Sequence, residues 1–397
     1  MEINSWTKGR GDITRCVRCL IIVMESRSKC FFIGSTLSDN PVPQHFVALA
    51  DELVQRGHRV VIIAPHRRID LETRDGNPAI YTWPSARPTR PQDAFFLNAL
   101  FKEYRPSCVI ANFAAVNLMC LVGSFAAVPV RVAWYHTVTA QLEHDHDGGS
   151  FRTQLLTMRK RFVYQRATHL VANSWASAHD LIEAYSVPPL KCRVFHNALA
   201  DPMPECGPDS APTDGNRLVC VGRLFPSKGQ DVLIRALAVL QASHPDAHVE
   251  FIGEGPAKDS YQNLAADLGI SNRCKFLGHL EHSEVLRRMA NAVATVVPSR
   301  SEAFGLVNIE SLAVGTPVIA SGVGGILEIV RDGMDGFLVP VDDPETLAAK
   351  VALLLSSPKL RHEMHCHARQ RFLAHFEQKK AVLEQADWFE SQVSSIQ

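Results

Sequence analysis

Residues 298–317 read Pro298-Ser-Arg-Ser-Glu302-Ala-Phe304-Gly305-Leu306-Val-Asn-Ile-Glu310-Ser-Leu-Ala-Val-Gly315-Thr-Pro317. An apolar run at 292–297 ends at the proline, and a polar loop follows it. Beyond the loop, apolar side chains recur at the spacing of a helix, at Leu306, Ile309 and Ala313. The segment therefore predicts a strand, a short loop and a helix.

The loop in this segment predicts an anion-binding site. Phe304, Gly305 and Leu306 lie where the helix begins, so their N–H groups lack helical acceptors and lie at the positive end of the helix dipole. Phosphate is the usual ligand of such a helix start. Glu302 and Glu310 flank it, and a carboxylate accepts two hydrogen bonds from a vicinal diol. The anion site and the two carboxylates together indicate a nucleoside diphosphate-sugar as the ligand. Alternatively, Glu302 caps the helix and Glu310 is a solvated acid of its first turn.

Length and composition describe a two-domain globular protein. The chain has 397 residues, of which 46% are hydrophobic and 21% charged. Its formal net charge is zero, so the overall charge favours no nucleic-acid partner. Ten cysteines without a regular framework indicate buried thiols in a reducing compartment, and we expect a cytoplasmic protein. Cys16-x-x-Cys19 is the only close pair, and no second pair stands at zinc spacing.

Charge is unevenly divided along the chain. Residues 1–200 contain 23 Lys and Arg against 16 Asp and Glu, whereas the remainder contains 18 against 25. A positive N-terminal half can make peripheral contact with an anionic surface, such as the inner face of a membrane or a lipid-linked acceptor. Equally, opposite charges can help two domains face each other. Both interpretations stay open from the sequence.

The N-terminal half begins with a polar, irregular segment. Residues 1–28 lack the apolar core and the cleavage site of a signal peptide, so we expect a disordered leader or a start at Met24. Alternating elements follow, and Gly57 marks the end of the first helix. We predict a strand, a helix and a parallel strand, at 29–34, 43–56 and 59–64.

An uncharged stretch at 107–130 is long enough to form a transmembrane helix. Asn112, Asn117 and Pro129 argue against that interpretation. We predict instead a buried strand, a helix and a second strand, at 108–112, 114–126 and 130–135. His136 follows the last of these, at the end of a parallel strand where open sheets bind ligands. A histidine at a strand end is often structural, so both roles are open.

A helix predicted at 151–166 carries basic residues among apolar ones, with Arg159, Lys160 and Arg161 beside Leu155 and Phe162. Such a helix can contact an anionic membrane, or it can present a solvated basic face. Both interpretations are kept.

The second half starts after an interdomain linker. Residues 200–216 are rich in Pro, Gly, Asp and Ser, which is typical of a linker. A strand at 218–222 follows, and Arg223 and Lys228 then precede a helix predicted at 230–241. Two cations beside a helix start are unfavourable for the dipole unless an anion lies between them.

The motifs of this half resemble those of a known family. Glu302-x7-Glu310 with Phe304-Gly305 between resembles the signature of the retaining family 4 glycosyltransferases, which have the GT-B fold. Arg223-x4-Lys228 matches the diphosphate clamp of that family. The resemblance covers residues 29–390, is most specific over 218–340, and includes Gly253, Gly278, Gly315-Thr-Pro317, Gly324-Gly325, Glu328 and Asp335-Gly336.

The resemblance implies an α/β fold of GT-B type, with two doubly wound parallel-sheet (Rossmann-like) domains facing a central cleft. We expect an acceptor-side domain at 29–199, the linker at 200–216, and a nucleotide-sugar domain at 217–377. A final helix within 378–397 is expected to pack back on the first domain.

The implied activity is retaining transfer of a sugar from a nucleotide diphosphate-sugar to a glycan, lipid-linked or small-molecule acceptor. A role in cell-surface polysaccharide or glycolipid synthesis is implied as well. Catalytic roles fall to His136 and Glu302, which would position the sugar. Substrate-binding roles, with Glu310 on the ribose, fall to Arg223, Lys228, Gly253, Gly278, Phe304, Gly305, Leu306 and Glu310.

Cations and amides at this site would already stabilise the departing diphosphate, so we expect no cofactor and no divalent metal. His144-Asp-His146-Asp is the nearest cluster that could bind a metal instead, although it also fits a solvated loop. Two other functions fit the same motifs. One is a nucleotide-sugar 2-epimerase on a related fold, and the other is a non-catalytic subunit that binds a sugar nucleotide.

Overall fold

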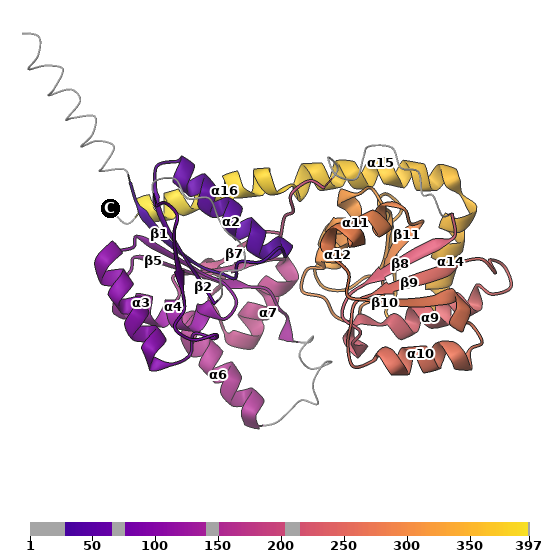
Figure 1. The fold of residues 1–397 in the computed structure, drawn as a ribbon, viewed down its shortest axis with the longest axis horizontal. Coiled ribbons are helices and arrows are strands. Elements are labelled where there is room, and N and C mark those ends of the chain that lie inside the picture. The colour runs from indigo at the N-terminus through magenta and orange to yellow at the C-terminus, as the bar shows by residue number, and fades with distance from the viewer. Residues whose placement is uncertain (1–27, 66–75, 140–150, 203–214, 396–397) are drawn as a thin grey trace, which may run out of the picture.

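Two parallel sheets form the framework of the protein (Figure 1). The structure, a computed structural model, describes residues 28–65, 76–139, 151–202 and 215–395. Residues 1–27 of the predicted leader, the Cys16/Cys19 pair, most of the linker and the His144/His146 cluster lie outside these residues. In the described part, no helix has both the length and the apolar character needed to cross a bilayer.

The N-terminal domain contains a seven-stranded sheet in the order β3-β2-β1-β4-β5-β6-β7. Every neighbouring pair is parallel. The strands are β1 (Cys30–Gly34), β2 (Arg59–Ala64), β3 (Ala79–Thr82), β4 (Cys108–Ala111), β5 (Val130–Tyr135), β6 (His169–Ala172) and β7 (Cys192–Val194). The helices are α2 (Pro41–Gln55), α3 (Pro91–Tyr104), α4 (Ala115–Phe125), α6 (Phe151–Arg166) and α7 (Trp175–Tyr185), with a 3-10 turn at Pro189–Lys191.

The C-terminal domain contains a six-stranded parallel sheet in the order β10-β9-β8-β11-β12-β13. Its strands are β8 (Arg217–Val221), β9 (His248–Ile252), β10 (Cys274–Gly278), β11 (Ala294–Val297), β12 (Val318–Ser321) and β13 (Gly336–Val339). Its helices are α9 (Gln230–Val239), α10 (Lys258–Asp267), α11 (His282–Ala290), α12 (Leu306–Ala313), α13 (Ile326–Ile329), α14 (Pro344–Ser356) and α15 (Pro358–His375), with 3-10 turns at Pro226–Lys228 and Ser271–Arg273.

Helices cover both faces of each sheet, so the central strands are apolar on both sides. In β1, Phe32 packs with Trp83 and Phe101 on one face. Phe31 packs on the opposite face with Phe46. This double burial explains the continuous apolar runs in the sequence, and the predicted class of two parallel-sheet domains is confirmed. The uncharged stretch at 107–130 forms β4, α4 and the start of β5, as predicted.

The chain passes between the domains twice, at neighbouring points. Leu199 pairs with Glu377, and the Leu199 N–H donates to the Phe376 carbonyl at 2.9 Å. Beyond this point α16 (Gln378–Ser394) lies against α2 (Figure 1). Arg56 at the end of α2 pairs with Asp387 and Glu390 of α16, at 2.6 and 2.8 Å. Opposite charges from the two halves of the chain therefore meet where its last helix returns to the first domain.

Candidate functional site

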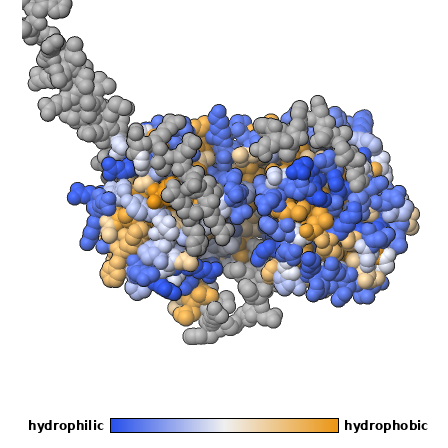
Figure 2. Space-filling model, in the orientation of Figure 1, coloured by the Kyte–Doolittle hydropathy of each residue, from blue (hydrophilic) through white to orange (hydrophobic). Residues whose placement is uncertain are grey.

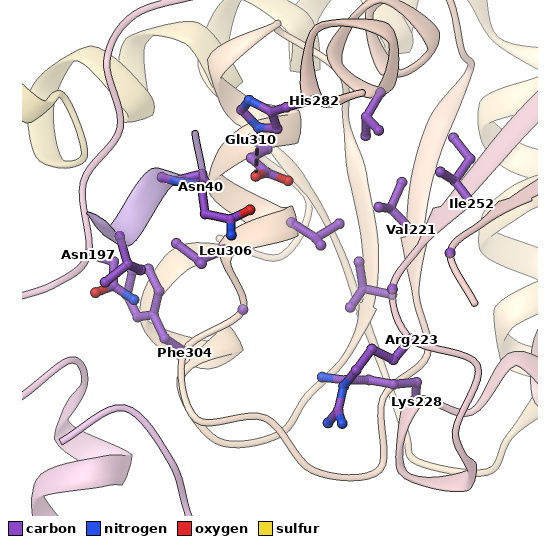
Figure 3. Close-up of a pocket in the computed structure, with 18 of the residues that line it drawn as sticks. Asn40, Asn197, Val221, Arg223, Lys228, Ile252, His282, Phe304, Leu306 and Glu310 are labelled. Carbon is purple, nitrogen blue, oxygen red and sulfur yellow. Dashed lines mark hydrogen bonds and ion pairs between the residues drawn. The ribbon is translucent and has the colours of Figure 1, made fainter. Parts of the chain in front are cut away.

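A cleft lies between the carboxyl ends of the two sheets, where parallel sheets bind ligands. Its cavity measures about 1150 Å³ and is lined by loops of both domains (Figure 3). Nine of the ten predicted site residues line it: His136, Arg223, Lys228, Gly253, Glu302, Phe304, Gly305, Leu306 and Glu310. Residues at distant places in the sequence are thus brought to one cavity.

Gly278 is the exception among the predicted site residues. It is not among the residues that line the cavity. Its carbonyl accepts the N–H of Gly253 at 2.8 Å, so it lies behind the wall that Gly253 forms. In the structure Gly278 therefore supports that wall, and its predicted contact with the ligand stays a prediction.

The start of α12 has the geometry that its sequence predicted. Gly305 immediately precedes the helix with φ of 96°, a left-handed conformation that favours glycine. A Cβ on Gly305 would lie 2.3 Å from the side-chain nitrogen of Asn308. The backbone and side-chain N–H groups of Asn308 both donate to the Gly305 carbonyl at 3.0 Å. The helix start is therefore fixed before any ligand binds.

The alternative structural roles of the two glutamates do not match the structure. Within the described residues, no side chain caps α12, so Glu302 is not its cap. Glu310 lies beyond the first turn, and it is 7% exposed. A buried carboxylate requires a partner, and each of these two acids has one.

Glu302 is paired with Lys228. The Lys228 Nζ lies 2.6 Å from a carboxylate oxygen of Glu302, and both side chains are largely buried. The loop that carries Lys228 reaches this position because Gly229, with φ of 64°, lies against the carbonyl of Pro298, where a Cβ would be 2.0 Å from the oxygen. We expected Lys228 on the diphosphate and Glu302 on the sugar. In the structure the two groups form an ion pair with each other.

Arg223 forms the other part of the predicted clamp. Its guanidinium lies over the ring of Phe225 at 4.7 Å, and its carbonyl accepts the side-chain amide of Gln230 at 3.0 Å. In Figure 3 the side chains of Arg223 and Lys228 project from the same loop toward the cavity. Two cations therefore lie beside the start of α9, and both line the cavity.

Glu310 is paired with a histidine that sequence reasoning missed. The Nε2 of His282 lies 3.0 Å from a carboxylate oxygen of Glu310, and both residues line the cavity (Figure 3). His282 is the first residue of α11, after the short loop that follows β10. Its position shortly after a strand end was the sequence feature that could have identified it as a site residue. The hydrogen bond to Glu310 raises the pKa of His282, against the opposing effect of partial burial.

We expect the ionisation of His282 to depend on Glu310. Because the folded-state pKa is raised, the stabilisation from the pair is present at low pH and is lost as the pH rises through that pKa. In Glu310→Gln the pKa of His282 should fall toward its ordinary value. An NMR titration of the His282 ring in both proteins measures this, with Glu345→Gln, an exposed acid of the same domain, as the control. An identical titration in Glu310→Gln would contradict the assignment.

His136 is held on the opposite side of the cleft, where β5 ends. Its Nε2 lies 2.6 Å from the side-chain oxygen of Asn112, and its ring stacks on that of Phe113 at 4.9 Å. Burial, helped by the nearby His45, lowers the pKa of His136 to about 3. The imidazole is therefore neutral at physiological pH. With Nε2 donating to Asn112, Nδ1 is left as a hydrogen-bond acceptor.

The remaining wall comes from the N-terminal domain. Polar side chains and prolines around the start of α2 line it, namely Thr36, Ser38, Asp39, Asn40, Pro41 and Pro43, together with Asn173 and Asn197. The hydroxyl, amide and carboxylate side chains among them can hydrogen-bond to a hydroxylated acceptor. For residues 28–65, 76–139, 151–202 and 215–395, no group of three or more His, Cys, Asp or Glu side chains could hold a metal ion.

Both halves of the chain match models of known protein families. The model of the glycosyl transferases group 1 matches residues 208–371, and that of Glycosyltransferase Family 4 matches residues 42–200. A D-inositol 3-phosphate glycosyltransferase of Acidothermus cellulolyticus is 37% identical over 51% of this chain and 48% of its own length. A glycogen synthase of Mycobacterium tuberculosis is 29% identical over 70% of this chain and 66% of its own. The chain thus spans about half the length of the first of these relatives.

Solved structures share the fold at low sequence identity. HepE of Anabaena in complex with UDP superposes with a TM-score of 0.73 at 20% identity, covering 91% of this chain and all of that one. Sucrose-phosphate synthase of Thermosynechococcus elongatus gives the same TM-score and identity over 92% of this chain. Two family models match consecutively along the two domains, and the motif residues Glu302, Phe304, Gly305 and Glu310 line one cleft. The chain therefore belongs to the retaining family 4 glycosyltransferases of GT-B fold.

Proposed function

We propose that this protein transfers a sugar, with retention, from a nucleoside diphosphate-sugar to a hydroxyl group of an acceptor. One observation carries the proposal. Arg223, Lys228 and the start of α12, which suit a diphosphate, line the same cavity as Glu310, which suits a ribose diol. UDP is the nucleotide we propose, because HepE, which shares the fold, binds UDP.

The proposed chemistry is a displacement at the anomeric carbon. The bond from that carbon to the diphosphate oxygen breaks while a bond to the acceptor oxygen forms on the same face. Arg223, Lys228 and the amides of Phe304–Leu306 stabilise the negative charge that develops on the leaving diphosphate. The diphosphate takes the acceptor proton, so no protein base is assigned. Neutral His136 accepts a hydrogen bond from a sugar hydroxyl at Nδ1, and Glu302 faces the sugar.

The proposed acceptor is a glycan, a lipid-linked sugar or a small hydroxylated molecule. The polar N-terminal wall of the cavity supports this class. Among the relatives, one is named a D-inositol 3-phosphate glycosyltransferase and another a glycogen synthase. We propose that the reaction belongs to cell-surface polysaccharide or glycolipid synthesis. We also propose that it needs no divalent metal, because the side-chain cations and helix-start amides that line the cavity would stabilise the diphosphate.

One incubation tests the proposal. Labelled nucleotide sugars are supplied with and without glycan, inositol phosphate and lipid-linked acceptors, each in the presence and absence of a chelator. Acceptor-dependent release of UDP and a labelled product are expected, with no loss on chelation. Release of UDP and an epimerised sugar without acceptor would indicate an epimerase. Binding without turnover would indicate a non-catalytic subunit, and activity restored only by a divalent ion would contradict the metal-free proposal.

We also propose that α6 makes peripheral contact with an anionic membrane. Leu155, Met158 and Phe162 are exposed on this helix, and Arg159 and Arg161 are exposed beside them. In Figure 2, apolar side chains gather where α6 lies, at the lower end of the N-terminal domain. Apolar and basic side chains in one exposed helix suit an interface that is both apolar and negative.

Removal of the charge should weaken that contact. A cation near an anionic surface contributes about 1 kcal/mol, so Arg159→Gln/Arg161→Gln should lower partitioning onto phosphatidylserine vesicles by about 30-fold. Sedimentation with vesicles measures the bound fraction. The control is Lys275→Gln/Lys359→Gln, which removes two exposed cations of the C-terminal domain. Equal binding by the two double variants would contradict the proposal and leave the solvated basic face as the interpretation of α6.

A further inference from the structure

Glu328 joins the two domains through contacts that its motif position did not predict. It lies in α13 of the C-terminal domain, yet its carboxylate accepts the backbone N–H groups of Trp175 and Ala176 at 2.9 and 3.1 Å. These are the first residues of α7 in the N-terminal domain. A carboxylate at the positive end of a helix is favourable, so the C-terminal domain supplies an anion to a helix of its neighbour.

The same carboxylate contacts His196. The Nε2 of His196 lies 2.8 Å from a Glu328 oxygen, and the ring of His196 stacks on the ring of Phe304 at 5.7 Å. Partial burial opposes ionisation of Glu328. The hydrogen bonds from His196, Trp175 and Ala176 outweigh it and lower the pKa of Glu328 below its ordinary value. The group is therefore a carboxylate over the physiological range.

A second contact joins α7 to the loop of the candidate site. The hydroxyl of Ser174, which caps α7, donates to the carbonyl of Ala303 at 2.5 Å. Ala303 lies between Glu302 and Phe304, so this loop is held from the N-terminal domain by Ser174 and by the ring of His196. The backbone carbonyl of Glu328 accepts a hydrogen bond from the guanidinium of Arg371 at 2.9 Å. The carboxylate therefore extends from a fixed backbone.

From these contacts we infer that Glu328 is a positioning residue, which sets the N-terminal domain against the loop 302–305 in the arrangement required for sugar transfer. This inference rests on the proposed function. Arg223, Lys228 and Glu310 belong to the C-terminal domain alone, so nucleotide binding does not require the contact. Sugar transfer does require the contact between Glu328 and α7, because His136 of one domain and Glu302 of the other must contact the same sugar.

Glu328→Gln separates these two requirements. The α7 amides donate to separate oxygens of the Glu328 carboxylate. Glutamine keeps the shape, but one of its two terminal atoms is a donor, so it cannot accept at both positions. Turnover should fall by about tenfold or more, since small misplacements of catalytic groups have effects of this size and larger. The dissociation constant for UDP should stay within about twofold of the wild-type value, because the nucleotide contacts proposed above remain in place. Glu345→Gln, an exposed acid of the same domain, is the control for both readouts.

Hydrogen exchange provides a readout that does not depend on activity. The amides of Trp175 and Ala176 should lose protection in Glu328→Gln and Glu328→Ala, and should keep it in Glu345→Gln. Hydrogen exchange tests the contact between Glu328 and α7 even if the wild-type protein transfers no sugar. A failure of the proposed function can therefore be distinguished from a failure of this inference. Unchanged protection, wild-type turnover in Glu328→Gln, or a loss of UDP affinity equal to the loss of turnover would each overturn the inference.

Discussion

Glu302→Gln is expected to lower turnover by about 100-fold, the usual effect of removing one group that stabilises charge in a transition state. Glutamine keeps the shape of the side chain but removes the negative charge that would stabilise an oxocarbenium-like sugar. Affinity for UDP should not fall. The substitution releases Lys228 from its 2.6 Å ion pair, which leaves the ammonium available to the diphosphate. Steady-state kinetics and calorimetry on the same samples measure the two quantities.

Glu310→Gln is the matched control for this prediction. Glu310 is expected on the ribose, which the free nucleotide and the nucleotide sugar share. Its substitution should therefore weaken both ligands alike, as expected for a contact made equally in the ground state and the transition state. The two variants should separate in a plot of nucleotide affinity against turnover. Wild-type turnover of Glu302→Gln with every competent donor and acceptor would remove the catalytic role assigned to Glu302.

Elements whose signal is local could be predicted from the sequence. The strand, loop and helix of residues 292–313 appear as β11, the loop and α12, because an apolar run, a glycine and a helical repeat all lie within one short segment. The basic helix predicted at 151–166 has the bounds of α6. The edge strand β3 was missed, because its residues are half-exposed and give no continuous apolar run.

The partners of the site residues could not be predicted, because each lies far away in the sequence. Lys228 and Glu302 are 74 residues apart, and Glu328 is 132 residues from His196. Spacing within a motif identifies a carboxylate, but it does not identify the group that the fold brings to it. His282 illustrates this, because its position after a strand end was visible and its pairing with Glu310 was not.

Lys228→Ala and Arg223→Ala should each weaken UDP binding by about 1.5 kcal/mol or more, which is about tenfold in the dissociation constant, as expected for a charge-assisted contact. The structure predicts that the two losses differ. Arg223→Ala removes one cation. Lys228→Ala also leaves the largely buried carboxylate of Glu302 without its ion-pair partner, and that negative charge then lies in the same cavity as the diphosphate. The lysine substitution should therefore have the larger effect in calorimetry.

A double-mutant cycle isolates this difference. In Lys228→Ala/Glu302→Gln the uncompensated carboxylate is gone, so UDP should bind more tightly than to Lys228→Ala alone, with an interaction energy of about 1 kcal/mol for groups in direct contact. Lys275→Ala, which removes an exposed cation of the same domain, should leave affinity unchanged. Wild-type affinity in both single variants would refute the clamp. Strict additivity in the cycle would show instead that Lys228 contacts the diphosphate independently of Glu302, and that the ion pair has no influence on nucleotide affinity.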